Sequence, residues 1–163
     1  MLPFDPSEDS REFRGALGAF ATGITVVTTD SSEGPVAIVA NSFASVSLDP
    51  PLVLWSPAKA SARFKHFAGA QRFAIHVLAE GQRDICAAIV DSMTAIQDVP
   101  MLKSNCGMPI IDGALATFEC SLEATHDGGD HIIVVGRVTK AHRKLGRPLV
   151  FHDGKYGELK QAQ

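Results

Sequence analysis

The segment 41–51 (NSFASVSLDPP) carries the side chains best suited to bind a ligand. Its polar and apolar residues alternate before two prolines end it, and alternation at period two sends successive side chains to opposite faces of a strand. We therefore predict that the hydroxyls of Ser45 and Ser47 share one face, which is free of charge and bulk. With Asn41 and Ser42 they could hydrogen-bond a phosphate or the carbonyls of a heterocycle. The alternative is an ordinary exposed strand end, where serine is common.

A second candidate anion site is the tripeptide Lys59-Ala60-Ser61. We expect it to begin a helix over residues 59–68, and free backbone N–H groups at the start of a helix favour an anion. Lys59 would add a full positive charge and Ser61 a hydroxyl. The alternative for Lys59 is a solvated surface side chain.

His131 follows a predicted tight turn at 127–130 (DGGD) and opens an otherwise apolar strand. A histidine in this place can orient a substrate or carry a proton near neutral pH. The alternative is a structural histidine that ties down the hairpin. His152 and Tyr156 form a further polar pair after the expected last strand, for which the alternative is a surface turn.

Composition limits the class of protein to which these residues belong. With 163 residues, of which 45% are hydrophobic, the chain fits one domain (1–163) with a sizeable core. A formal net charge of −3 disfavours binding to nucleic acid. No apolar run reaches membrane-spanning length, and the N-terminus lacks the basic start of a secretion signal. We therefore expect a cytoplasmic protein without a nucleic-acid or membrane partner.

The cysteines, histidines and serines match no familiar catalytic or metal-binding motif. Cys86, Cys106 and Cys120 fit neither a zinc spacing nor a disulfide framework, so we expect Cys86 and Cys120 to be buried and Cys106 to lie in a loop. No metal-ligand spacing relates His66, His76, His126 and His142. Neither a G-x-S-x-G elbow nor an HExxH pair occurs. A polar pocket without acid–base machinery indicates that a bound cofactor carries the chemistry.

Hydrophobic periodicity predicts the elements that position these side chains. A capping box at 9–12 begins a helix that ends near residues 22–23, with Phe13, Leu17 and Phe20 on one face. Further helices are expected over residues 59–68 and 81–93, and residues 93–113 are expected to be mostly loop.

Alternating and β-branched segments predict the strands. They span residues 24–29, 35–41, 52–56, 73–78, 115–125, 131–138 and 148–152, and the first two should form a hairpin. Six or more mostly adjacent strands indicate a mainly β protein, an antiparallel barrel with two to four flanking helices. No glycine-rich loop joins a strand to a helix, which argues against a Rossmann or P-loop nucleotide site.

The order of several motifs resembles the short-chain flavin reductases, which have the FMN-binding split-barrel fold. The motifs are ATGITVVT at 21–28, the segment 41–54, the strand 73–78 followed by Gln82, and the C-terminal Gly129-Asp130-His131, Gly136-Arg137-Val138 and PLVF at 148–151 with Gly154 and Tyr156. Each motif alone is weak, but their order is specific and covers about residues 11–157.

The resemblance implies a homodimer with an antiparallel split β-barrel that binds FMN or FAD and reduces it with NADH or NADPH. Hydride would pass from nicotinamide C4 to flavin N5. His131 matches the family's histidine near the nicotinamide and is the expected catalytic residue. The expected flavin-binding residues are Val39 (through its backbone), Asn41, Ser42, Ser45, Ser47, Lys59, Ala60, Ser61, Phe151, His152 and Tyr156.

Within that family such a protein would feed reduced flavin to a separate flavin-dependent monooxygenase. Two alternatives remain open from the sequence. One is a flavin-binding electron-transfer or storage protein without appreciable reductase turnover. The other is a split-barrel scaffold that binds a partner protein and has lost its cofactor. FMN and FAD are both compatible with the sequence, and so are NADH and NADPH. The sequence is also compatible with a flavin that stays bound and with one that exchanges as a substrate.

Overall fold

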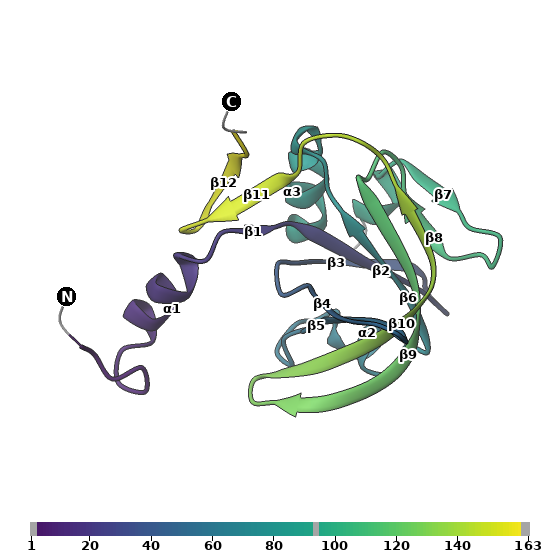
Figure 1. Ribbon diagram of the computed structural model, residues 1–163. Coiled ribbons are helices and arrows are strands. Elements are labelled where there is room, and N and C mark those ends of the chain that lie inside the picture. The colour runs from purple at the N-terminus through teal and green to yellow at the C-terminus, as the bar shows by residue number, and fades with distance from the viewer. Residues whose placement is uncertain (1–2, 93–94, 161–163) are drawn as a thin grey trace.

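Seven antiparallel strands form the main sheet of the protein in the computed structural model, which describes residues 3–92 and 95–160 (Figure 1). In chain order these strands are β2 (Thr25–Ser31), β3 (Gly34–Ala40), β4 (Ala44–Leu48), β5 (Pro51–Trp55), β6 (Arg72–Val77), β9 (Ala116–Gly128) and β10 (His131–Arg143). Their order across the sheet is β3-β2-β6-β9-β10-β5-β4. The predicted mainly β, antiparallel architecture is confirmed, including the hairpin of β2 and β3.

The sheet curls around one apolar core and is covered on its outside by a second. Val26 and Val27 are adjacent in β2 and both are fully buried, so β2 has a packed layer on each face. Val27 packs in a cluster with Trp55 and Phe73. Val26 belongs to a different cluster, which includes Ile89 of α3 (Arg83–Asp91). The β-branched run of β2 therefore forms the wall between the two cores.

The N-terminal helix, α1 (Ser10–Gly18), begins as predicted but is shorter than predicted. Asp9 caps it by accepting hydrogen bonds from the backbone N–H groups of Arg11 and Glu12 at 3.1 and 2.9 Å. The predicted end near residues 22–23 is wrong, because Thr22–Gly23 form strand β1 and pair with β11 (Leu149–His152). Figure 1 shows α1 as an arm that stands away from the barrel.

A small C-terminal sheet lies beside that arm, in the order β1-β11-β12. β12 (Lys155–Glu158) was not predicted, since its four residues include a glycine and show no alternation. The β11–β12 turn is made by Asp153 and Gly154, both with positive φ, as a two-residue hairpin turn requires. His152 and Tyr156 therefore lie on two paired strands and not in a surface turn.

The predicted loop at 93–113 is largely ordered as short elements. Its described part contains the 3-10 turn η2 (Ala95–Asp98) and a hairpin of β7 (Met101–Lys103) and β8 (Pro109–Ile111). Three-residue strands are too short to show a period, so the sequence could not reveal them. The predicted helix at 81–93 is a 3-10 turn, η1 (Glu80–Gln82), followed by α3, and its predicted last residue, Met93, lies outside the described residues.

The three cysteines lie where the sequence predicted. Cys86 and Cys120 are buried and Cys106 is exposed in a turn before β8. Burial raises the pKa of Cys86 to about 11 and that of Cys120 to about 12, so both remain neutral thiols near pH 7.

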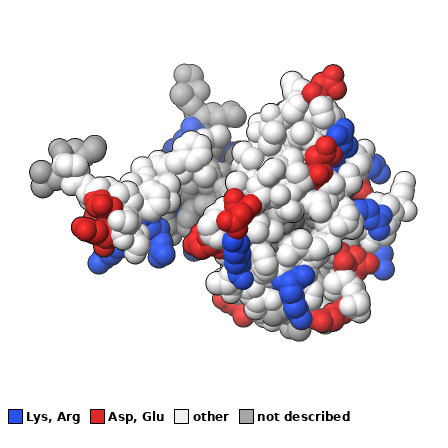
Figure 2. Space-filling model, turned by 90° about the horizontal axis from the view of Figure 1, so that it is seen from below, with Lys and Arg blue, Asp and Glu red and all other residues white. Residues whose placement is uncertain are grey.

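Charged side chains of both signs are interspersed on the face shown in Figure 2, and no field of one sign extends across it. None of the helices in the described ranges 3–92 and 95–160 is long and apolar enough to cross a membrane.

Candidate functional site

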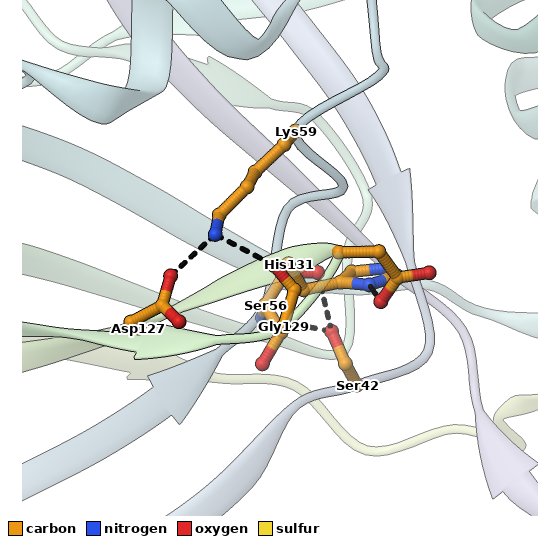
Figure 3. A network of polar contacts seen from close by, with 7 residues as sticks. Ser42, Ser56, Lys59, Asp127, Gly129 and His131 are labelled. Atoms are coloured by element: carbon orange, nitrogen blue, oxygen red, sulfur yellow. Dashed lines mark hydrogen bonds and ion pairs between the residues drawn. The ribbon is translucent and has the colours of Figure 1, made fainter.

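The candidate site lies at a seam where the two edges of the curled main sheet approach each other. β3 and β4 are the edge strands. The residues after β3 meet those after β5 through Ser42, whose Oγ accepts a hydrogen bond from the backbone N–H of Ser56 at 2.9 Å (Figure 3). The Ser42 hydroxyl can also donate to the Ser56 carbonyl at 3.3 Å. Among the described residues, the hydrogen bonds across the seam come from the Ser42 hydroxyl and not from a strand pairing.

A cavity of about 320 Å³ opens beside this seam. Its lining consists of Ile38, Val39, Ala40, Asn41, Ser42, Trp55, Ser56, Pro57, Ala58, Ser61 and His131. The residues that were predicted for the site and line this cavity are Val39, Asn41, Ser42, Ser61 and His131. Segments that are far apart in the sequence therefore converge on one hollow.

The polar groups of the cavity suit a heterocycle better than a free charge. β3 is an edge strand, so alternate backbone N–H and C=O groups on its outer side have no strand partner. Asn41 is exposed, and its side chain bonds no other residue in the described part of the chain. Because the Ser42 hydroxyl is already bonded to Ser56, a ligand contact at Ser42 would fall to its backbone.

A neighbouring hollow of about 350 Å³ shares Asn41 with the cavity and is lined also by Thr22, Gly23 and Phe43. Among the described residues, the Thr22 hydroxyl is buried without a hydrogen-bond partner. A buried hydroxyl of this kind is unfavourable unless a polar group meets it. Two neighbouring hollows that share Asn41, with an unpaired hydroxyl and a free strand edge, fit a flat ring system with several polar atoms. Thr22 was not among the predicted site residues, although it lies within the motif at 21–28.

Lys59 does not begin a helix, contrary to the prediction. Its backbone N–H donates to the carbonyl of Asp130 at 2.9 Å, and Ala58 forms a β-bridge with His131. These contacts hold the segment against β10, so that the helix α2 (Phe64–Ala68) starts only at Phe64. The Lys59 ammonium binds the Asp127 carboxylate and, at 2.6 Å, the Gly129 carbonyl. A helix-start anion site at residues 59–61 is therefore absent from this part of the structure.

The two strand serines do not share a face. A β-bulge places Ser45 opposite Val53 and Ser47 opposite Leu52. Val53 and Leu52 are consecutive in β5 and point to opposite faces of the sheet, so Ser45 and Ser47 do as well. Neither serine lines the cavity at the seam.

His131 stands at the start of β10, on the rim of the cavity. A hydrogen bond of 2.7 Å joins its Nδ1 to the Asp130 carboxylate. This bond, together with the nearby histidine charge, lowers the pKa of Asp130. The side chain of His131 remains 42% exposed, and it therefore can meet a ligand that enters from solvent.

The three C-terminal residues predicted for the site lie on the small sheet, outside the cavity. The rings of Phe151 and Tyr156 pack edge to face with centroids 5.5 Å apart, and both contact the core cluster against which Val39 packs. The Arg83 guanidinium lies 5.0 Å from the Tyr156 ring centre. Burial raises the pKa of Tyr156, whereas His152 is exposed.

A hollow of about 400 Å³ at the other end of β9 and β10 contains none of the predicted site residues. Its buried carboxylate, Glu119, lies 4.0 Å from Lys140 and 3.7 Å from His142, and its Oε1 has no hydrogen-bond partner among the described residues. We assign the site to the seam, because the predicted residues Val39, Asn41, Ser42, Ser61 and His131 converge there.

A curled antiparallel sheet with a hollow at its seam is the architecture of a split-barrel protein. Residues 17–160 match the family described as flavin reductase like domain. The chain belongs to this family.

Known proteins resemble the chain over nearly its whole length. FMN reductase (NADH) SmoA of Agrobacterium fabrum is 51% identical over 152 residues, which cover 93% of this chain and 87% of that protein. The flavin-dependent monooxygenase reductase subunit HsaB of Mycobacterium tuberculosis is 41% identical, over 91% of this chain and 81% of HsaB.

The solved structure of the NADH:FAD oxidoreductase SgcE6 of Streptomyces globisporus C-1027 superposes with a TM-score of 0.93 at 33% identity, covering 100% of this chain and 99% of that one. SgcE6 has also been solved in complex with NAD and FAD fragments, with a TM-score of 0.91. The expected split-barrel fold is confirmed.

Proposed function

We propose that this protein is an NAD(P)H:flavin oxidoreductase that reduces FMN or FAD at the seam. The observation that carries the proposal is the cavity itself, which gathers Asn41, Ser42, Ser61 and His131 from separate segments of the chain. Of the relatives named above, SmoA is an FMN reductase that uses NADH and SgcE6 is an NADH:FAD oxidoreductase. A bound flavin supplies the redox chemistry, and the protein supplies binding and orientation.

Four lining residues, and three residues of the small sheet outside the cavity, have a definite part in this proposal. The backbone of Val39 and the amide of Asn41 bind the polar edge of the flavin ring, and the Ser61 hydroxyl binds toward its phosphate. His131 would orient the nicotinamide, and the bound nicotinamide and flavin would supply the hydride-transfer chemistry. Phe151, His152 and Tyr156 form a neighbouring wall. We do not assign a flavin contact to Ser45, Ser47, Lys59 or Ala60, none of which lines the cavity.

We further propose that the protein works as a homodimer. None of the residues of α1, all within the described range, is buried, and the apolar stripe on α1 is open to solvent. The exposed fractions of Phe13, Leu17 and Phe20 are 43%, 60% and 78%. An apolar stripe on an arm that stands off its own barrel can be buried against a second copy of the chain. Phe20 also lines the hollow that shares Asn41, so a second copy would lie close to the flavin.

We also propose that the reduced flavin passes to a separate monooxygenase in the cytoplasm. The name of HsaB describes it as the reductase subunit of a flavin-dependent monooxygenase, and a further relative is the reductase component of a trigonelline monooxygenase. Cys86, Cys106 and Cys120 are all unpaired, in keeping with a reducing compartment.

Anaerobic stopped-flow mixing tests the reductase activity directly. The protein is mixed with FMN or FAD and with NADH or NADPH, and flavin absorbance is followed. We expect bleaching with at least one pair, and bleaching with no pair would contradict the proposal. The matched variants Asn41→Ala and Asn105→Ala locate the site, because Asn105 is exposed far from the seam. Asn41→Ala should raise the flavin Kd about tenfold and Asn105→Ala should not change it.

A further inference from the structure

The tip of the β9–β10 hairpin is fastened to the segment that follows β5. The backbone N–H of Lys59 donates to the Asp130 carbonyl at 2.9 Å, and that of Ile132 donates to the Pro57 carbonyl at 3.2 Å. Between these two bonds Ala58 forms a β-bridge with His131. Residues 57–59 thus lie in register against residues 130–132, on the rim of the cavity.

The side chain of Lys59 adds a second set of contacts at the turn (Figure 3). Its Nζ binds the Asp127 carboxylate and the Gly129 carbonyl, so one ammonium joins the end of β9 to the turn itself. The hydrogen bond from Lys59 and its charge lower the pKa of Asp127. The Lys59 side chain is 39% exposed, compared with 77% for Asp127.

The turn that carries His131 needs such a restraint. Gly128 and Gly129 stand just before Asp130, and Gly129 has a φ of 76°. Glycine has more accessible backbone conformations than any other residue, so two in succession make a loose tip. His131 begins β10 immediately after this tip. Its place over the cavity therefore depends on what holds the turn.

We propose that Lys59 is a positioning residue for hydride transfer, which fixes the β9–β10 turn and thereby holds His131 where the nicotinamide binds. This inference rests on the reductase function proposed above. Lys59 acts through the hairpin and not as a ligand for the phosphate of flavin or NADH, because a carboxylate and a carbonyl already engage its ammonium.

A double-mutant cycle on the full chain tests this inference, with Lys59→Met, Asp127→Asn and the two combined. Lys59→Met should raise the KM for NADH about fivefold, as expected for a lost exposed ion pair and one hydrogen bond. Asp127→Asn should raise it less, about twofold, since the Gly129 contact remains. The double variant should be no worse than Lys59→Met, and the Kd for FMN should stay within about twofold throughout.

The opposite pattern would overturn the inference. If Lys59 bound a phosphate directly, Asp127→Asn would free its ammonium and lower the KM for NADH or the Kd for FMN. Loss of stability in Lys59→Met with an unchanged KM would also overturn it, because the residue would then be structural only. The control is Lys65→Met, whose exposed ion pair with Glu33 at 3.5 Å lies elsewhere. It should leave KM and Kd unchanged.

Amide hydrogen exchange provides a readout that does not require turnover. Exchange over residues 128–132 should become at least about threefold faster in Lys59→Met, while exchange in β2 should not change. Equal exchange rates over residues 128–132 in the wild type and in Lys59→Met would show that Lys59 does not hold the β9–β10 turn. If the wild type failed to reduce flavin, the reductase proposal would fall, but this measurement would still report whether Lys59 holds the turn.

Discussion

The barrel and the N-terminal arm use apolar side chains in opposite ways. Trp55 and Phe73 in the barrel are 0% and 1% exposed and pack with ring centroids 6.1 Å apart. Leu17 and Phe20 in and just after α1 are 60% and 78% exposed. Both regions show regular hydrophobic periodicity, so periodicity alone does not distinguish them.

The difference indicates two separate uses of hydrophobic free energy. Apolar area buried within the barrel stabilises the folded protomer. Apolar area left on the arm contributes only when another surface covers it. Substitutions in the barrel should therefore change the free energy of unfolding, and substitutions in the arm should change association.

The largest effect should come from truncating a ring in the barrel. Phe73→Ala should lower the free energy of unfolding by about 4 kcal/mol, because a cavity replaces contacts with Trp55. Phe20→Ala, the matched change in the arm, should lower it by less than about 0.5 kcal/mol at protein concentrations where the protomer is isolated. Urea unfolding measures both changes in unfolding free energy. Similar values for Phe73→Ala and Phe20→Ala would contradict the proposed difference between the barrel and the arm.

A buried histidine should make the barrel sensitive to acid. His76 is 0% exposed, with Nδ1 donating to the Val26 carbonyl at 3.0 Å, and burial lowers its pKa from 6.5 to about 4. The unfolded chain takes up a proton near pH 6.5 and the folded protein only near pH 4, so acidification through this window favours unfolding. Between pH 6.5 and pH 4 the protonation of His76 should lower the free energy of unfolding by about 3 kcal/mol in total.

The variant His76→Gln has no titrating group at this position, so its unfolding free energy should fall less between pH 6.5 and 5 than that of the wild type. His142→Gln is the control, because the side chain of His142 is 58% exposed. Urea unfolding at several pH values gives the comparison. If the unfolding free energy of the wild type changed with pH as much as that of His76→Gln, burial of the His76 ring would not be the cause of the acid sensitivity.

The seam should show an intermediate effect, because the Ser42 hydroxyl supplies its hydrogen bonds among the described residues. Ser42→Ala leaves the Ser56 N–H without its partner and should destabilise the protomer by about 1–2 kcal/mol. Ser45→Ala, on exposed β4, should have an effect below about 0.5 kcal/mol. A Ser42→Ala variant as stable as Ser45→Ala would mean that the seam is held by other contacts.

Elements with strong local signals were predictable, and contacts between distant segments were not. The β-branched run of β2 and the capping residue Asp9 act locally, and both were identified. The bulge that separates Ser45 from Ser47 arises from pairing with β5 and leaves no mark on the alternation. Lys59 was assigned to a helix because its partners, Asp127 and Gly129, lie about 70 residues away.

The site was predictable in the same uneven way. Asn41, Ser61 and His131 were predicted from residue type and family resemblance, and in the structure they line one cavity. The bond from Ser56 to the Ser42 hydroxyl depends on the curl of the whole sheet, which no local pattern encodes. Thr22 was missed because its hydroxyl becomes notable only once burial has removed every other partner among the described residues.

The smallest effect on the protomer, and the most direct test of the arm, should come from Leu17→Lys. Lysine and leucine have similar helix propensities, so α1 should persist and protomer stability should change by less than about 0.5 kcal/mol. The lysine would place a charge in the proposed dimer interface, and the dimer Kd should rise at least about tenfold. Sedimentation velocity over a concentration series measures this change. The control Arg14→Ala should leave the Kd within about threefold.

Two results would remove the contrast between barrel and arm. A wild-type protein that sediments as a monomer at high concentration would leave the stripe of Phe13, Leu17 and Phe20 without a second copy to cover it. A Leu17→Lys dimer as tight as the wild type would place the interface elsewhere. If instead Leu17→Lys weakens the dimer and also raises the flavin Kd, the arm completes the site. Phe20 already lines the hollow that includes Asn41, so dimerisation through the arm and binding of the flavin would then be coupled.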